Sequence, residues 1–195
     1  YQLTFDDKWF ITAQNLADQV LKHFPTEDGG FFDTSDDHEA LIVRPRNAQD
    51  NAVPSGNNMI AKQLIRLAAY TGEAHYDEAA RGVLRLLTEA LKQYPQAFGE
   101  ALNATDMLVQ GMTEIAIVGE PQVDETQHLL AVLYEIYRPN IIVALTPNDA
   151  SETMPIPLLN YRTQRDDKPT VYVCRNFACR MPVTSPDEVR GLLEQ

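Results

Sequence analysis

The sequence predicts a mainly α fold that ends in a small α/β segment, because its hydrophobic period changes near Gly111. Before this glycine, apolar residues recur every three or four positions. After it, short apolar runs of strand length alternate with helical patterns. We therefore expect helical hairpins over residues 1–110 and an α/β segment with a βαβ unit over residues 111–195.

Four helices are expected in the first segment, at about residues 4–24, 55–72, 75–94 and 98–108. The first begins with a capping-box-like pair, Thr4 and Asp7, and stops before Pro25. The second starts at the N-cap Ser55, ends at Gly72 and is apolar on most sides, which is typical of a buried helix. Consecutive helices of this kind form antiparallel hairpins. Between the first two, residues 25–54 are expected to form two short extended pieces joined by a polar turn.

The second segment is expected to contain strands at residues 113–118, 141–145 and 170–173. A helix at about residues 124–137 separates the first two strands, which indicates a parallel, right-handed βαβ unit. Residues 147–165 are rich in proline and are expected to be irregular. Ser185, Pro186 and Glu188 carry the N-cap, N1 and N3 signals of a last helix.

Composition excludes several classes of function. With 16 basic and 28 acidic residues the formal net charge is −12, which argues against a nucleic-acid partner. No apolar run reaches the ~20 residues of a membrane span. The chain starts with Tyr1 just before a helix, and its first residues do not show the charged-then-apolar pattern of a signal peptide. We therefore expect the carboxy-terminal part of a larger cytoplasmic protein, with no cofactor.

Three stretches carry a family resemblance. They are residues 28–34 (DGGFFDT), residues 44–57 (RPRNAQDNAVPSGN) and residues 172–174 (YVC) with Cys179 and Pro182. Together they resemble the carboxy-terminal region of the YyaL-like, spermatogenesis-associated proteins. The resemblance spans essentially the whole chain. It implies part of an (α/α)6 toroid similar to N-acylglucosamine 2-epimerases and six-hairpin glycosidases. It also implies an amino-terminal thioredoxin-like domain in the parent protein.

By analogy with these toroids, the chain is expected to contribute part of a cavity for a sugar-like or anionic molecule. The alternative is a non-catalytic scaffold for the thioredoxin-like domain. The candidate ligand-binding residues are Asp28, Gly29, Gly30, Phe31, Asp33, Arg44, Asp50, Asn51, Ser55 and Asn57. Glycines allow close ligand approach, and a helix N-terminus with nearby arginines suits anions and polyols. Two alternatives stay open. In the first, the turn is structural and Phe31 and Phe32 fill the core. In the second, Ser55 and Asn58 only cap the helix, while Arg44 pairs with local acids.

No catalytic residue can be assigned. The four histidines, among them His38 in an acidic run, sit in surface or capping positions, and the turn after the first strand lacks a phosphate-loop pattern. Cys174 and Cys179, separated by four residues, are either reduced thiols, a redox pair beside Arg175 or Arg180, or metal ligands. We expect no metal. Because neighbouring helices of a toroid would be missing, we also expect a homodimer through exposed helical surface.

Overall fold

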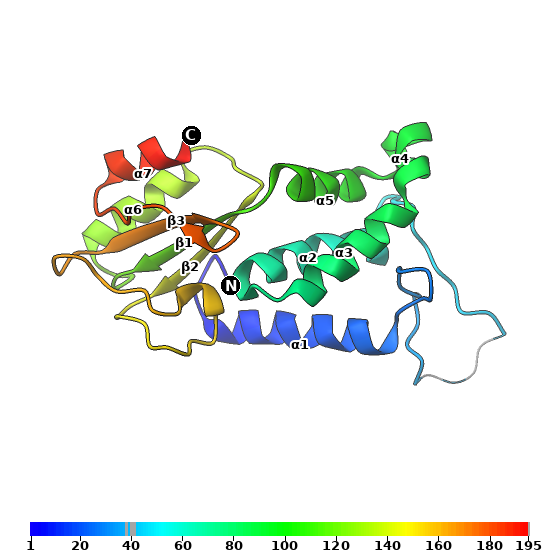
Figure 1. The fold of residues 1–195 in the computed structure, drawn as a ribbon. Helices are drawn as coiled ribbons and strands as arrows, with labels where there is room; N and C mark the ends of the chain where they lie inside the picture. The colour runs from blue at the N-terminus through cyan, green and yellow to red at the C-terminus, as the bar shows by residue number, and fades with distance from the viewer. Residues whose placement is uncertain (38, 40–41, 195) are drawn as a thin grey trace. The chain divides into compact units, whose positions relative to one another are not determined.

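The computed structural model describes residues 1–37, 39 and 42–194, which form seven α-helices and one four-stranded sheet (Figure 1). The chain divides into two compact units. The helical unit comprises Ile11–Ala68 and Glu73–Gln110, and the sheet unit comprises Tyr1–Phe10, Ala69–Gly72 and Gly111–Gln195. The predicted class, mainly α with a small α/β part, is confirmed. A domain boundary at residue 110 stays a prediction, because the sheet unit also includes the start of the chain.

The first five helices are α1 (Asp7–His23), α2 (Gly56–Thr71), α3 (Ala74–Leu86), α4 (Thr88–Gln93) and α5 (Gly99–Gln110), with a 3-10 turn, η1 (Pro95–Ala97), before α5. Helix α2 begins where its sequence predicts, because the Ser55 hydroxyl accepts a hydrogen bond from the Asn58 N–H at 3.2 Å. Its Ala61 and Leu64 are fully buried, as expected for a helix that is apolar on most sides.

The prediction of one helix over residues 75–94 is wrong, because the structure breaks it at Leu87 into α3 and α4. Leu87 is buried at the junction. Next to it, the Thr88 hydroxyl donates to the carbonyl oxygens of Leu84 and Arg85, at 3.4 and 2.9 Å. Such back-bonding by threonine bends helices, and the periodic pattern does not reveal it.

The two extended pieces predicted for residues 25–54 are also wrong. The described part of this segment contains an isolated bridge between Pro25 and Phe31 and is otherwise irregular. Its backbone groups bind side chains in place of a strand ladder; the Asn47 N–H, for example, donates to the carboxylate of Asp33. Leu41, which the second piece contained, lies outside the described residues.

The sheet has the order β2-β1-β3-β4. Its strands are β1 (Thr113–Val118), β2 (Ile141–Thr146), β3 (Thr170–Arg175) and β4 (Ala178–Cys179). Strands β1 and β2 are parallel and flank α6 (Asp124–Tyr134), so the predicted βαβ unit is confirmed. Strand β3 pairs antiparallel with both β1 and β4.

One face of the sheet is covered by α6 and by α7 (Pro186–Leu193) (Figure 1). Ile115, Val143 and Val173 belong to the buried cluster on this face. Side chains alternate along a strand, so Glu114 and Cys174 lie on the other face. The turn η2 (Pro157–Leu159) contacts β1 and β2. Helix α7 carries the predicted capping box between Ser185 and Glu188.

None of the described helices combines the length and the apolar character that a bilayer crossing requires.

Candidate functional site

The glycine turn of the segment before α2 packs against α3. Gly29 has a φ of +102°, and a Cβ added to Gly82 would lie 2.7 Å from the carbonyl oxygen of Gly29. A Cβ on Gly30 would lie 3.1 Å from the side chain of Leu86 and 3.3 Å from that of Asn57. The close approach that these glycines permit is therefore an approach to a helix of the same unit.

Phe31 is fixed by Asn57. The Phe31 N–H donates to Oδ1 of Asn57 at 2.8 Å, and Nδ2 of Asn57 donates back to the Phe31 carbonyl at 2.9 Å. Both residues are buried. The Asn57 side chain thus makes the two hydrogen bonds that a neighbouring strand would make with the Phe31 backbone. Its amide group therefore serves the fold.

The charged candidates of the same segment are also paired. Asp28 accepts two hydrogen bonds from Arg46, at 2.6 and 2.8 Å, and these bonds hold the pKa of the Asp28 carboxyl below its usual value. Arg44 donates to the carbonyl oxygens of His23 and Thr34. Its guanidinium also lies 4.2 Å from the centre of the Phe32 ring.

Asp50 joins three elements of the helical unit. Its Oδ1 accepts from the Ser55 N–H at 2.9 Å and from Nδ2 of Asn58 at 2.8 Å. Its Oδ2 accepts from the Glu100 N–H at 2.8 Å, at the start of α5. Asn51 is exposed and accepts from the Ala52 N–H. The candidate residues thus lie close together, but their hydrogen bonds correspond to the capping alternative, and Arg44 binds carbonyl oxygens where local acids were expected. Ligand binding by them stays a prediction.

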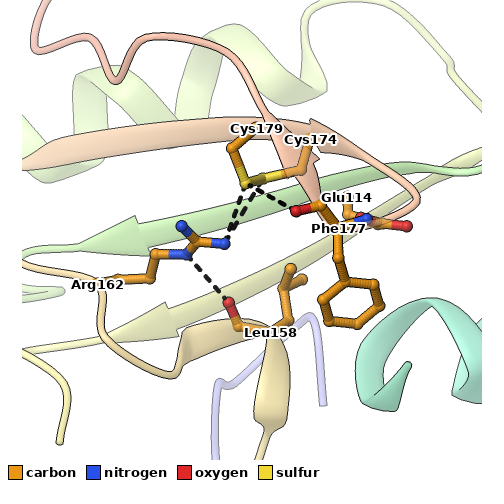
Figure 2. The surroundings of a disulfide bond; sticks show 6 residues. All are labelled: Glu114, Leu158, Arg162, Cys174, Phe177 and Cys179. Atoms are coloured by element: carbon orange, nitrogen blue, oxygen red, sulfur yellow. Dashed lines mark hydrogen bonds between the residues drawn. A yellow bond between two sulfur atoms is a disulfide. The ribbon is translucent and has the colours of Figure 1, made fainter. Parts of the chain in front are cut away.

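Cys174 and Cys179 are joined by a disulfide across the hairpin of β3 and β4 (Figure 2). They are direct register partners in this hairpin. The two cysteines are thus bonded to each other and not reduced in this structure, and a redox role for the pair stays a prediction. Cys174 is 1% exposed, whereas Cys179 is partly exposed. A reactant from solvent reaches Cys179 first.

Arg162 contacts both sulfur atoms. Its Nη2 lies 3.0 Å from Sγ of Cys179 and 3.9 Å from Sγ of Cys174 (Figure 2). Nε of Arg162 donates to the Leu158 carbonyl at 3.4 Å, and the guanidinium lies 4.9 Å from the centre of the Tyr172 ring. These contacts aim the positive charge at the disulfide.

The two residues of the hairpin turn have left-handed backbones. Asn176 has a φ of 50° and Phe177 a φ of 60°. Positive φ at both central residues is the requirement of a type I′ turn, but a bulky residue such as Phe rarely adopts it. The Phe177 ring fills the space beside Gly72, where an added Cβ would lie 3.2 Å from it. Tertiary contacts thus hold a strained residue next to the disulfide.

Glu114 of β1 is the buried acid of the site. It is 3% exposed, and its Oε2 accepts a hydrogen bond from the Phe177 N–H at 2.8 Å (Figure 2). Burial raises the pKa of Glu114, while the backbone N–H groups of Phe177 and Asn176 and the charge of Arg162 act in the opposite direction. A disulfide, a cation and a buried acid therefore meet on one face of the sheet.

Sequence reasoning missed Arg162 and Glu114. It placed the cation at Arg175 or Arg180, but the hydrogen-bond contact with the sulfurs comes from Arg162, in a segment that has no periodic pattern. One signal could have identified Glu114, because a charged residue inside an apolar strand is rarely buried without a reason.

One group of described side chains could face a single metal ion. The ligand atoms of His23, Asp36 and Asp37 lie within 4.8 Å of one another. His23 Nδ1 is already 2.7 Å from Asp36, and both carboxylates are exposed. We assign no metal to this group. His38, from the same acidic run, lies outside the described residues.

Known proteins resemble the chain over most or all of its length. Spermatogenesis-associated protein 20 of Mus musculus is 32% identical over 199 residues, which cover 100% of the chain and 25% of that protein. The Homo sapiens protein of the same name is 31% identical over 99% of the chain and 25% of its own length. An uncharacterised protein of Caenorhabditis elegans is 25% identical over 85% of the chain. No family model matches the chain.

The chain spans about a quarter of the length of the curated relatives that it matches. The similarity agrees with the spermatogenesis-associated part of the resemblance noted in the sequence. The likeness to epimerase and glycosidase toroids has no counterpart among these relatives and stays a prediction.

Proposed function

We propose that the chain carries a thiol–disulfide exchange site at Cys174 and Cys179. The observation that carries this proposal is the guanidinium of Arg162, which lies 3.0 Å from one sulfur and 3.9 Å from the other. A cation beside a sulfur stabilises the thiolate, which is both the nucleophile and the leaving group of exchange. A disulfide with a purely structural task has no need of such a cation.

The reaction needs a dithiol partner. One partner thiolate attacks Sγ of Cys179 and forms a mixed disulfide with it. The Cys174–Cys179 bond breaks, its electron pair goes to Cys174, and this sulfur takes up a proton. The second partner thiolate then attacks the partner sulfur of the mixed disulfide, and Cys179 leaves with the electron pair and takes up a second proton. Two electrons and two protons thus pass to the chain, and the partner is oxidised to a disulfide.

The short span of the disulfide supports an exchange role. The two cysteines are five positions apart, so the bond closes a very small loop. Loop-closure entropy then contributes only about 2 kcal/mol to stability. The β3–β1 pairing and the Glu114 contact hold the hairpin independently of the sulfurs. Breaking the bond is therefore compatible with an intact fold.

The dithiol partner that the family resemblance implies is the amino-terminal thioredoxin-like domain. The exchange proposal shares this partner with the expected scaffold role but differs from it by adding a redox reaction. A cytoplasmic location, also expected from the sequence, fits the same proposal, because disulfides of cytosolic proteins are usually transient and catalytic or redox-sensing.

Equilibration in glutathione redox buffers tests the proposal. The protein is trapped by alkylation at each potential, and the two cysteines are counted by mass spectrometry. We expect a midpoint above about −300 mV, the region in which labile disulfides are found. A pair that stays oxidised down to that potential is structural and overturns the proposal.

The role of Arg162 is tested by the rate of reduction with dithiothreitol. Arg162→Gln is expected to slow reduction roughly tenfold, the effect of about 1.4 kcal/mol on the barrier. Arg162→Lys keeps the charge and should restore part of the rate. The matched control is Arg165→Gln, which removes a nearby arginine whose guanidinium donates to the Pro182 carbonyl. Equal rates in wild type and Arg162→Gln would remove the cation from the mechanism.

A sugar-like ligand in the segment before α2 is weaker as a proposal, because Asp50 and Arg44 form hydrogen bonds with backbone groups of the fold itself. A thermal-shift screen of monosaccharides and disaccharides decides the matter. Stabilisation of the wild type that both Asp50→Ala and Arg44→Ala abolish would favour the ligand. No shift with any sugar would leave these residues a purely structural role.

A homodimer through helical surface also stays a proposal. The helical unit has an open groove of about 720 Å³, lined partly by Leu84, Leu91 and Leu102 and by the exposed Val109. Apolar surface of this kind favours an interface. Light scattering that finds a monodisperse monomer would contradict the dimer.

A further inference from the structure

A second hollow lies at the hairpin end of the sheet unit. Its volume is about 300 Å³, and its wall includes Thr113, Arg138, Arg175, Arg180, Leu192 and Leu193. Cavities that hold small molecules start at about this volume. The wall combines an apolar side, from α7, with three guanidinium groups from β3, from the segment after α6 and from the residue after β4.

The hollow is lined by positive charges, whereas the chain as a whole is negatively charged. The chain has 28 acidic and 16 basic residues, yet none of the described residues that line the hollow carries a carboxylate. The acid nearest in sequence to Arg138 is Glu135, and Arg190 holds it with bonds of 2.6 and 3.0 Å. Like charges gathered in a hollow repel one another and focus a positive potential on its interior.

We infer that this hollow, the arginine pocket, is a binding site for a small organic anion whose carboxylate or phosphate is bound by the guanidinium groups of Arg138, Arg175 and Arg180. Guanidinium forks match the oxygens of carboxylates and phosphates in pairs. The leucines of α7 offer an apolar wall to the carbon skeleton of the ligand, and the Thr113 hydroxyl offers one more polar contact.

The arginine pocket lies against the disulfide hairpin, and Cys174 is among the residues that line it. Arg175 and Arg180 directly follow the two cysteines in the sequence. The disulfide joins the two strand positions from which these arginines follow. Reduction therefore loosens the spacing of two pocket arginines and weakens anion binding. This coupling rests on the proposed exchange function, whereas the pocket itself does not.

Calorimetric titration of the oxidised protein with inorganic phosphate and with succinate tests the pocket. We expect saturable binding of at least one of these anions and no binding of succinamide, the neutral amide of the same shape. Arg175→Gln and Arg138→Gln should each weaken binding roughly tenfold, as expected for a lost charge-assisted contact. Arg175→Lys should fall between wild type and Arg175→Gln, because it keeps the charge and loses the fork.

The matched control is Lys22→Gln, which removes an exposed cation at the end of α1 and changes the net charge equally. If neither anion binds, or if Lys22→Gln weakens binding as much as Arg175→Gln, the pocket is overturned. The same titration after reduction tests the coupling separately. Weaker binding by the reduced protein supports it. Equal binding in both states removes the coupling and leaves the pocket, and an inert disulfide contradicts only the exchange function.

Discussion

The carboxylate of Glu114 accepts a hydrogen bond from the backbone N–H of Phe177 at 2.8 Å, across 63 residues of sequence. This contact links the buried face of β1 to the turn that carries the disulfide. It also places an acid with a raised pKa beneath a strained residue. The stability of the hairpin should therefore depend on pH through Glu114.

The first prediction concerns this pH dependence. Burial raises the pKa of Glu114 above its ordinary value of 4.5, so folding favours the protonated form. The carboxylate does not destabilise the fold at a pH below the ordinary pKa of 4.5, because the group is then protonated in both states. Its destabilising effect is complete at a pH above the raised pKa of the folded protein. Stability should thus fall as the pH rises through this window. Glu114→Gln removes the titration and keeps an acceptor oxygen for Phe177.

Denaturant unfolding at several pH values checks it. The difference in free energy of unfolding, Gln variant minus wild type, should rise with pH from about 4.5 and then become constant. Glu120→Gln, which removes an exposed carboxylate after β1, serves as the control. A difference for Glu114→Gln that does not change with pH would contradict the prediction.

The second prediction is that reduction leaves the fold intact. Because the disulfide closes so short a loop, reduced wild-type protein should lose only about 2 kcal/mol of unfolding free energy. Urea unfolding with and without reductant measures this loss. The variant with both Cys174→Ala and Cys179→Ala should have the same unfolding free energy with and without reductant. Global unfolding on reduction would mean that the hairpin depends on its disulfide.

Local patterns were sufficient for most of the regular elements. The apolar runs of β1 and β2 and the Ser185 capping signal predicted their elements with nearly correct bounds, because burial and capping depend on residues close in sequence. The break between α3 and α4 at Leu87 was not predicted, since it is associated with the hydrogen bonds of a single hydroxyl, that of Thr88. Strand β4 was not predicted, because a strand of two residues is too short to show an alternating pattern.

The candidate site was predictable only in part. The sequence shows Cys174 and Cys179 and allows their pairing, but the type I′ turn that joins them lacks its usual glycine. Arg162 reaches the sulfurs from an irregular segment, and its position depends on the contacts of η2 with β1 and β2. No local pattern encodes such a contact.

The third prediction concerns Asp50, whose carboxylate accepts from Ser55, Asn58 and Glu100. Asp50→Ala leaves these donors without their acceptor and should cost roughly 2–4 kcal/mol of unfolding free energy. Asp50→Asn keeps one oxygen and should cost less. Asn51→Ala, at the exposed neighbouring position, should change little. Equal stability of Asp50→Ala and wild type would mean that this network does not hold the helical unit.

The fourth prediction compares two helical glycines with opposite surroundings. In Gly82→Ala the new Cβ would lie 2.7 Å from the carbonyl oxygen of Gly29. Because the contact is with a backbone atom, it cannot be relieved by rotating a side chain. The clash should lower the unfolding free energy by roughly 1–3 kcal/mol, more than the gain in helix propensity. Gly191 in α7 has open space around its Cβ position.

Gly191→Ala is therefore the matched control and should raise stability by up to about 1 kcal/mol, the propensity difference between Ala and Gly. Thermal or urea unfolding of both variants measures the two effects under identical conditions. Because the substitution is the same, the sign of each effect reports the surroundings of the glycine alone. Stabilisation by Gly82→Ala would mean that the Gly29 turn does not pack on α3. It would also contradict the assignment of residues 28–33 to a structural role.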